Sequence, residues 1–134
     1  MPTSVEQTLY LDASALVKLV VPEPESAALS LFVADRPVLS SCALARVEVV
    51  RAVAPQGNEA VSTARGVLRE LDLVQLDDEL LDLAAELDAP LRRLDAIHVA
   101  AALELGDALE ALVTYDARMI DGASGLGLPV LSPV

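Results

Sequence analysis

The chain has 134 residues, about the length of one domain, and 54% of them are hydrophobic, which is enough to form a buried core. Its 21 acidic and 9 basic residues give a formal net charge of -12, which argues against a general electrostatic grip on nucleic acid or on an anionic membrane. The single cysteine, Cys42, excludes an internal disulfide framework, and the single histidine, His98, excludes a zinc site built on several histidines. We expect one domain over residues 1–134.

Targeting signals are not evident in the sequence. No stretch stays apolar over the roughly 18–20 residues that a membrane-spanning helix needs. The first seven residues contain Glu6 and no basic residue, so they lack the charged start of a secretory signal. We therefore expect a cytoplasmic protein that does not interact with membranes.

Charge is unevenly distributed along the chain. Residues 1–70 hold 8 acids and 6 bases, whereas residues 71–134 hold 13 acids and 3 bases. The only lysine is Lys18, and arginine favours planar, bidentate contacts to phosphate or carboxylate. Four arginines of the less acidic half either contact a nucleic acid or simply solvate helices: Arg46, Arg51, Arg65 and Arg69.

Short apolar runs alternate along the chain with longer segments of helical periodicity. We predict strands over residues 8–11, 37–40, 73–76, 111–114 and 129–131. We predict helices over residues 14–21, 26–34, 43–53, 59–71, 78–88, 93–105 and 116–122. Prolines and glycines separate several of these helices, and Asn58 and Asp77 are placed to cap the helices that follow them.

This alternation of strands and helices predicts the fold class. Strands joined through helices form right-handed crossovers and a parallel sheet that is covered on both faces. Strands buried on both faces read as continuous apolar runs, as they do here. We therefore predict an α/β protein, a three-layer α/β/α sandwich with a parallel sheet of about five strands.

Four acidic residues stand out by their positions. Asp12 follows the first predicted strand and Asp116 follows the fourth, and ligands of open parallel sheets bind beyond the carboxyl ends of strands. Glu48 and Asp95 lie within apolar helical surroundings. Each also has a structural interpretation: Asp12 and Asp116 as helix N-caps, Glu48 as a partner of Arg51, and Asp95 as an acid in a first helical turn.

The four acids together favour a metal site. Carboxylates that converge on one crevice repel each other unless a cation lies among them. Ligand sets made of oxygen alone suit Mg²⁺ or Mn²⁺. Such an ion suits the chemistry of phosphate esters, because it activates a water molecule and neutralises charge on the phosphoryl and leaving oxygens.

Around these acids the sequence resembles the PIN-domain family, and within it the VapC-type toxins of bacterial toxin–antitoxin pairs. The resemblance lies in residues 9–18, 46–48, 94–102 and 112–116, which occur in the family's order over nearly the whole chain. The segments Asp-x-Ser-Ala-Leu-Val-Lys and Leu-Asp-Ala-Ile-His-x-Ala-Ala-Ala are fairly specific in combination. Tyr115 stands where the family has an asparagine, which puts the substrate contacts of that loop in question.

The resemblance implies a metal-dependent ribonuclease in which Asp12, Glu48, Asp95 and Asp116 are the catalytic, metal-binding acids. It implies that Ser14 and Thr114 assist them by holding ligands or water, and that water attacks phosphorus while the 3′-oxygen leaves. It also implies a homodimer and a cognate antitoxin protein. A basic tail on that antitoxin would complement the acidic chain, and its binding would then depend on salt.

Two alternatives remain open from the sequence. The chain could be a PIN-fold module that binds RNA or a protein without catalysis, although four mutually repelling acids would then have no evident use. His98 lies three residues after Asp95, so both side chains can share one face of a helix. It is either a hydrogen-bonded packing residue or a catalytic base.

Overall fold

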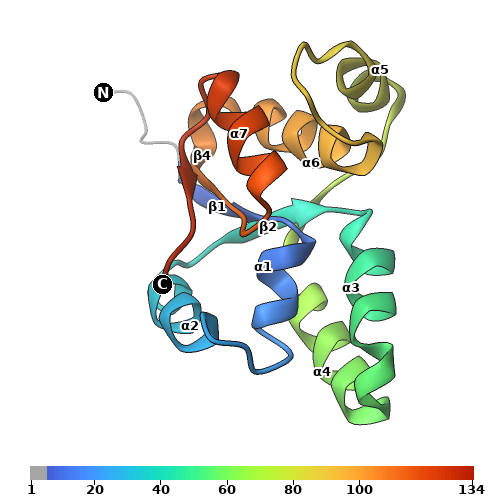
Figure 1. Ribbon diagram of the computed structural model, residues 1–134, viewed down its shortest axis with the longest axis vertical. Helices are drawn as coiled ribbons and strands as arrows, with labels where there is room; N and C mark the ends of the chain where they lie inside the picture. Colours follow the sequence, from blue (N-terminus) through green and yellow to red (C-terminus); the bar gives the residue numbers. More distant parts are fainter. Residues whose placement is uncertain (1–5) are drawn as a thin grey trace.

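A parallel five-stranded sheet forms the centre of the protein in the computed structural model, which describes residues 6–134 (Figure 1). The strands are β1 (Thr8–Leu11), β2 (Leu39–Cys42), β3 (Asp72–Val74), β4 (Leu109–Val113) and β5 (Val130–Leu131). Their order across the sheet is β3-β2-β1-β4-β5, and every neighbouring pair is parallel. The strand that begins the chain therefore lies in the middle of the sheet.

Helices cover both faces of the sheet (Figure 1). One face carries α1 (Ala13–Lys18), α2 (Ser26–Val33), α3 (Ala45–Val53) and α4 (Asn58–Arg69). The other face carries α5 (Asp78–Glu86), α6 (Arg93–Glu104) and α7 (Ala117–Gly125). Two short 3₁₀ turns, Ala54–Gln56 and Gly106–Ala108, complete the set. The predicted three-layer α/β/α sandwich is confirmed.

Two hydrophobic cores explain why β1 is buried throughout. Successive side chains of a strand point to opposite faces of its sheet. Leu9 and Leu11 belong to the core under α1–α4, whereas Tyr10 belongs to the core under α5–α7. All three side chains are fully buried. The central strand thus supports both layers, and the chain leaves it at Asp12.

Some element boundaries differ from the prediction. The second strand covers 39–42 and not 37–40, because its register follows the pairing of Leu39 with Leu9 and of Cys42 with Val74. The third strand covers 72–74 for the same reason. The first helix already ends at Lys18, with Leu19 as its C-cap.

Two helix caps can be compared with the sequence prediction. Asn58 is the first residue of α4 and not its cap. Gly57 precedes it with φ of 110°, a conformation that glycine adopts far more easily than other residues. The prediction for Asp77 is confirmed, since its side chain accepts a hydrogen bond from the Leu80 amide.

No helix within residues 6–134 combines the length and apolar character needed to cross a membrane. The longest helices, α4 and α6, have 12 residues each.

Candidate active site

The site lies at the carboxyl ends of β1 and β4, which are neighbours in the sheet. Leu11 pairs with Val113, so the residues that follow each strand, Asp12 and Thr114, lie side by side. From β1 the chain continues to β2 on one side, whereas β4 lies on the other side. Strand order therefore reverses at this position, which is where open α/β sheets form ligand crevices.

Asp12 is the most enclosed of the four acids, with 3% of its surface exposed. Its Oδ1 atom accepts hydrogen bonds from the Ala15 amide at 3.1 Å and from Ser14 Oγ at 2.7 Å, so it is also the N-cap of α1. Its Oδ2 atom accepts from Thr114 Oγ1 at 2.6 Å. Burial raises the pKa of Asp12, and these hydrogen bonds offset part of that increase.

Asp116 and Thr114 are joined through the loop that follows β4. Asp116 is the N-cap of α7, with its Oδ1 atom accepting from the amides of Arg118 and Met119. Its own amide donates to Thr114 Oγ1 at 3.2 Å. Ser14 Oγ accepts from the Tyr115 amide at 3.0 Å. Ser14 and Thr114 therefore connect the two strand ends and hold Asp12 between them.

Tyr115, which directly precedes Asp116, is held by a contact to Pro133. Its hydroxyl donates to the Pro133 carbonyl at 2.7 Å. The Lys18 ammonium lies 4.7 Å from the centre of its ring. The loop is thus fixed by backbone contacts to Ser14 and by this tyrosine anchor.

Glu48 does not pair with Arg51, and this structural interpretation is wrong for residues 6–134, where no ion pair of Arg51 is present. Instead, Glu48 Oε1 lies 2.5 Å from His98 Nε2. His98 is 1% exposed, and its Nδ1 atom lies 2.7 Å from the Tyr10 hydroxyl. A ring so enclosed, with both nitrogens in hydrogen-bond contact, is not an accessible base in this structure.

Asp95 lies in the first turn of α6, as predicted. Its Oδ2 atom and Ser41 Oγ are the two buried side-chain polar atoms without a hydrogen-bond partner within residues 6–134. Burial raises the pKa of Asp95, the negative charges of Asp116 and Asp12 add to the increase, and Arg92 opposes it. Asp95 is therefore close enough to Asp116 and Asp12 for their charges to repel its own. One of its buried oxygens also lacks a hydrogen bond within residues 6–134.

An open cleft of about 820 Å³ gives access to this region. It is lined by two of the acids, Glu48 and Asp95, and by Arg92 and Arg93 at the start of α6, together with Leu91 and Leu94. Arg46 lies elsewhere, in a separate groove between α3 and α4 that also contains Arg65 and Arg69. Within residues 6–134, no three histidine, cysteine or acidic side chains are already grouped tightly enough to enclose an ion.

Sequence reasoning missed two residues of this region, Tyr10 and Arg92. Tyr10 carries a hydroxyl within a buried strand and precedes Asp12 by two residues. Arg92 directly precedes the helix that bears Asp95, and it is the N-cap residue of that helix. The tyrosine in the strand and the arginine before the helix were both visible in the sequence. Neither indicated which residue it would act on in the fold.

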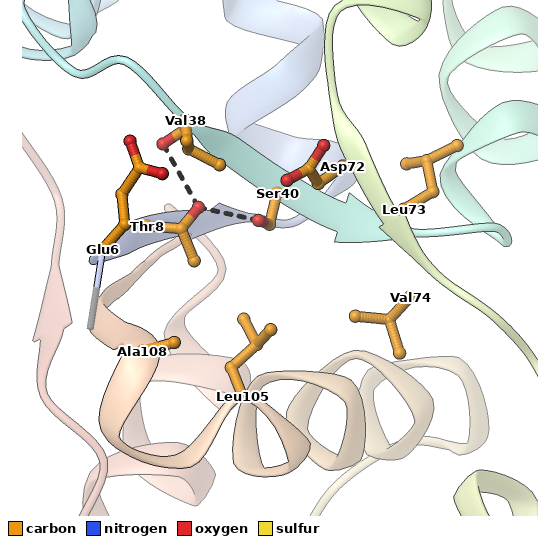
Figure 2. Close-up of a pocket in the computed structure, with 9 residues that line it drawn as sticks. All are labelled: Glu6, Thr8, Val38, Ser40, Asp72, Leu73, Val74, Leu105 and Ala108. Carbon is orange, nitrogen blue, oxygen red and sulfur yellow. Dashed lines mark hydrogen bonds between the residues drawn. The ribbon is translucent and has the colours of Figure 1, made fainter. Parts of the chain in front are cut away.

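A second hollow lies at the opposite edge of the sheet, where the strands begin (Figure 2). There Thr8 Oγ1 donates to the Val38 carbonyl at 3.2 Å and lies 2.7 Å from Ser40 Oγ. Glu6 and Asp72 line the same hollow, and both are exposed. None of the four predicted acids contributes to it.

Comparison with known proteins supports an assignment to a family. The model of the PIN domain matches residues 9–124. Ribonuclease VapC46 of Mycobacterium tuberculosis is 49% identical over 126 residues, which are 93% of this chain and 97% of the relative. Ribonuclease VapC35 of the same organism is 44% identical over 133 residues, covering 93% and 96% of the two chains.

Solved structures share the fold at lower identity. The M. tuberculosis toxin VapC20, described as cleaving the sarcin–ricin loop, has a TM-score of 0.75 and 16% identity over 93% of this chain and 99% of that one. A chain of a toxin–antitoxin complex from Klebsiella pneumoniae has a TM-score of 0.73 and 19% identity, with 94% and 98% covered. With a family match over most of its length and relatives above 40% identity, this chain belongs to the PIN-domain family.

Proposed function

We propose that the protein is a metal-dependent endoribonuclease that acts as the toxin of a toxin–antitoxin pair. The observation that carries the proposal is the convergence of Asp12, Asp95 and Asp116 at one edge of the sheet, with a buried Asp95 oxygen that has no hydrogen-bond partner among residues 6–134. The names of the relatives, ribonucleases VapC at 49% and 44% identity, support the activity.

The donor set fits Mg²⁺ or Mn²⁺. Its members are carboxylate oxygens, which hard divalent cations prefer, and the unpartnered Asp95 Oδ2 is an atom that a cation would satisfy. Mg²⁺ keeps several waters and binds through one or two carboxylates, so its binding does not need three acids grouped in advance. Asp12 and Asp95 would hold the ion directly, with Glu48 and Asp116 as direct or water-mediated ligands.

Each residue has a task that follows from its position. The bound ion would supply positive charge that activates water and neutralises charge on the phosphoryl oxygens. Thr114 and Ser14 orient the Asp12 carboxylate by donating to its two oxygens. Glu48 and Asp116 would bind the ion directly or through water, or help to orient the attacking water. The reaction places the 3′-oxygen on the leaving side and yields 5′-phosphate and 3′-hydroxyl ends.

RNA would enter through the cleft that contains Glu48 and Asp95. Arg92 and Arg93 provide positive charge at its wall, in a half of the chain with only three bases. Their guanidinium groups suit bidentate contact to a phosphate next to the scissile one. Local positive charge thus offsets the unfavourable net charge of the whole protein.

A protein antitoxin is the proposed partner, supported by the fold shared with a chain of the Klebsiella toxin–antitoxin complex. Charge complementarity with a basic segment would make its binding weaken as salt rises. The homodimer implied by the family resemblance stays a prediction. Sedimentation of the purified protein measures its oligomeric state.

The deciding experiment incubates antitoxin-free protein with a mixed RNA pool in Mg²⁺ or Mn²⁺ and in chelator. Asp95→Asn is the inactive variant, and Asp72→Asn, an exposed acid at the opposite edge, is its matched control. We expect metal-dependent cleavage by the wild type and by Asp72→Asn, and none by Asp95→Asn. Folded protein that binds Mn²⁺ but retains RNA uncleaved would contradict the proposal and indicate a PIN-fold binding module.

A further inference from the structure

A buried chain of hydrogen bonds joins the elements that carry three of the four acids. Tyr10 lies in β1 two residues before Asp12, and His98 lies in α6 one turn after Asp95. The Tyr10 hydroxyl is 2.7 Å from His98 Nδ1, and His98 Nε2 is 2.5 Å from Glu48 Oε1 in α3. Side chains 50 and 88 residues apart in the sequence are thereby connected.

Glu48 has a particular need for such a connection. Asp12 and Asp116 are held as N-caps of helices by backbone amides. Glu48 is neither a cap nor next to a strand end, and the His98 ring is its one side-chain partner within residues 6–134. Its side chain is 21% exposed, whereas that of His98 is 2% exposed. The buried ring is therefore the fixed member of the pair, and it holds the glutamate at the border of the cleft.

We propose that His98 and Tyr10 are positioning residues that set the place of Glu48 in the active site. His98 Nε2 donates to the Glu48 carboxylate, and the Tyr10 hydroxyl shares a hydrogen bond with Nδ1 on the other side of the ring. The edge-to-face packing of the two rings, whose centres are 5.8 Å apart, holds this geometry. The inference rests on the proposed function, because it gives a role to the carboxylate that Glu48 brings to the metal site.

The arrangement resembles the partners that orient ligands around metal sites in general, whose loss costs roughly 10- to 100-fold in metal affinity or activity. The sequence left His98 between a packing residue and a catalytic base. The contacts favour a third role, in which the buried ring acts through Glu48.

The test compares Mn²⁺ affinity, measured by calorimetry on antitoxin-free protein, with RNA cleavage and thermal unfolding. The variants are His98→Leu, which removes both ring contacts, His98→Gln, whose amide can still donate to Glu48, and Tyr10→Phe. Thr8→Val is the matched control, because it removes a buried side-chain contact of the same 2.7 Å length at the other end of β1 (Figure 2).

We expect His98→Leu to weaken Mn²⁺ binding and cleavage by about 10- to 100-fold. His98→Gln should recover part of both, and Tyr10→Phe should lose less than His98→Leu. Thr8→Val should lower the unfolding temperature while leaving Mn²⁺ affinity at the wild-type value. Unchanged Mn²⁺ affinity in folded His98→Leu, or in Tyr10→Phe if His98→Leu does not fold, would overturn the inference. An equal loss in Thr8→Val would do the same, because the effect would then be one of general stability.

A double-mutant cycle separates this inference from the proposed function. In a Glu48→Gln background, the His98 substitution should cause little further loss of cleavage, because both changes act on one carboxylate. If the wild type neither binds Mn²⁺ nor cleaves RNA, the proposed function fails. The His98–Glu48 coupling is then read from unfolding of the metal-free variants, and additive effects there would refute the contact itself.

Discussion

The two edges of the sheet handle buried polar groups in opposite ways. Where the strands begin, Thr8 and Ser40 are neutral, buried and bonded to each other, and the nearby acids Glu6 and Asp72 are exposed to water (Figure 2). Where β1 and β4 end, the polar groups are carboxylates. Asp12 is buried there with its hydrogen bonds made, and Asp95 retains a buried oxygen that has no hydrogen bond in the part of the chain that the structure describes.

This contrast indicates how a functional edge differs from a structural one. A hollow lined by acids exists at both edges, so neither the hollow nor the acids identify the site. Burying a charge costs free energy unless the charge is paired. Burying two hydroxyl groups that are hydrogen-bonded to each other costs little. The edge whose charge is left uncompensated within residues 6–134 is the one at which we propose that a cation and a phosphate bind.

The largest expected effect is that of Asp12→Asn. Asparagine retains an oxygen that can accept from the Ala15 amide, but it removes the negative charge between β1 and β4. We expect RNA cleavage to fall by at least about 100-fold, the order of loss seen when a charge-stabilising group is removed from an active site. RNA cleavage by Asp12→Asn is measured beside cleavage by Asp72→Asn. Equal losses of activity in both variants would contradict the difference between the two edges.

A smaller loss is expected for Thr114→Val. Valine has the shape of threonine but does not donate to Asp12 Oδ2 or accept from the Asp116 amide. We expect cleavage to fall roughly 10- to 100-fold, as for other groups that orient a metal ligand. Its counterpart at the other edge is Ser40→Ala, which should cost about 1 kcal/mol of stability with cleavage unchanged. Cleavage kinetics measure the loss of activity in Thr114→Val, and denaturant unfolding measures the loss of stability in Ser40→Ala. A loss of cleavage in Ser40→Ala as large as that in Thr114→Val would contradict the prediction.

A still smaller effect is expected for Arg92→Ala. If Arg92 contacts one phosphate, its removal should weaken RNA binding similarly for all sequences and reduce the salt slope of binding by about one. The turnover of bound RNA should change little, because the four acids are untouched. Titrations of uncleaved RNA with Asp95→Asn and with the Asp95→Asn, Arg92→Ala double variant measure this slope, and equal slopes would remove Arg92 from the substrate path.

The smallest effect concerns the stability of the metal-free protein. Burial and the nearby Asp116 and Asp12 raise the pKa of Asp95 in the folded state. A raised pKa means that this group's contribution to stability is full below its unfolded pKa of about 3.9 and is lost as pH rises through the folded pKa. Asp95→Asn should therefore increase the unfolding temperature by a few degrees at neutral pH, and by less near about pH 4.5. A gain that does not depend on pH would contradict this explanation.

The sequence alone was sufficient for features that depend on local chemistry. The short run of mostly apolar residues predicted a strand covered on both faces at the correct residues, 8–11. Such a strand buries its side chains on both faces, so nearly every position in it is apolar. Asp12, Asp77 and Asp116 were recognisable as caps because a cap is made within three residues of its helix. The alternation of these elements was enough to predict the three-layer fold.

Tertiary structure alone decided the features that depend on contacts between distant residues. The strand at 39–42 took its register from β1 and β3, and not from Pro37 or the apolar residues beside it. Glu48 contacts His98, 50 residues away, and not Arg51, three residues further along its own helix. Because a hydrogen bond depends on where two side chains meet in space, helical spacing predicted a plausible partner for Glu48, but only the tertiary fold, which brings Glu48 of α3 next to His98 of α6, determined the real one.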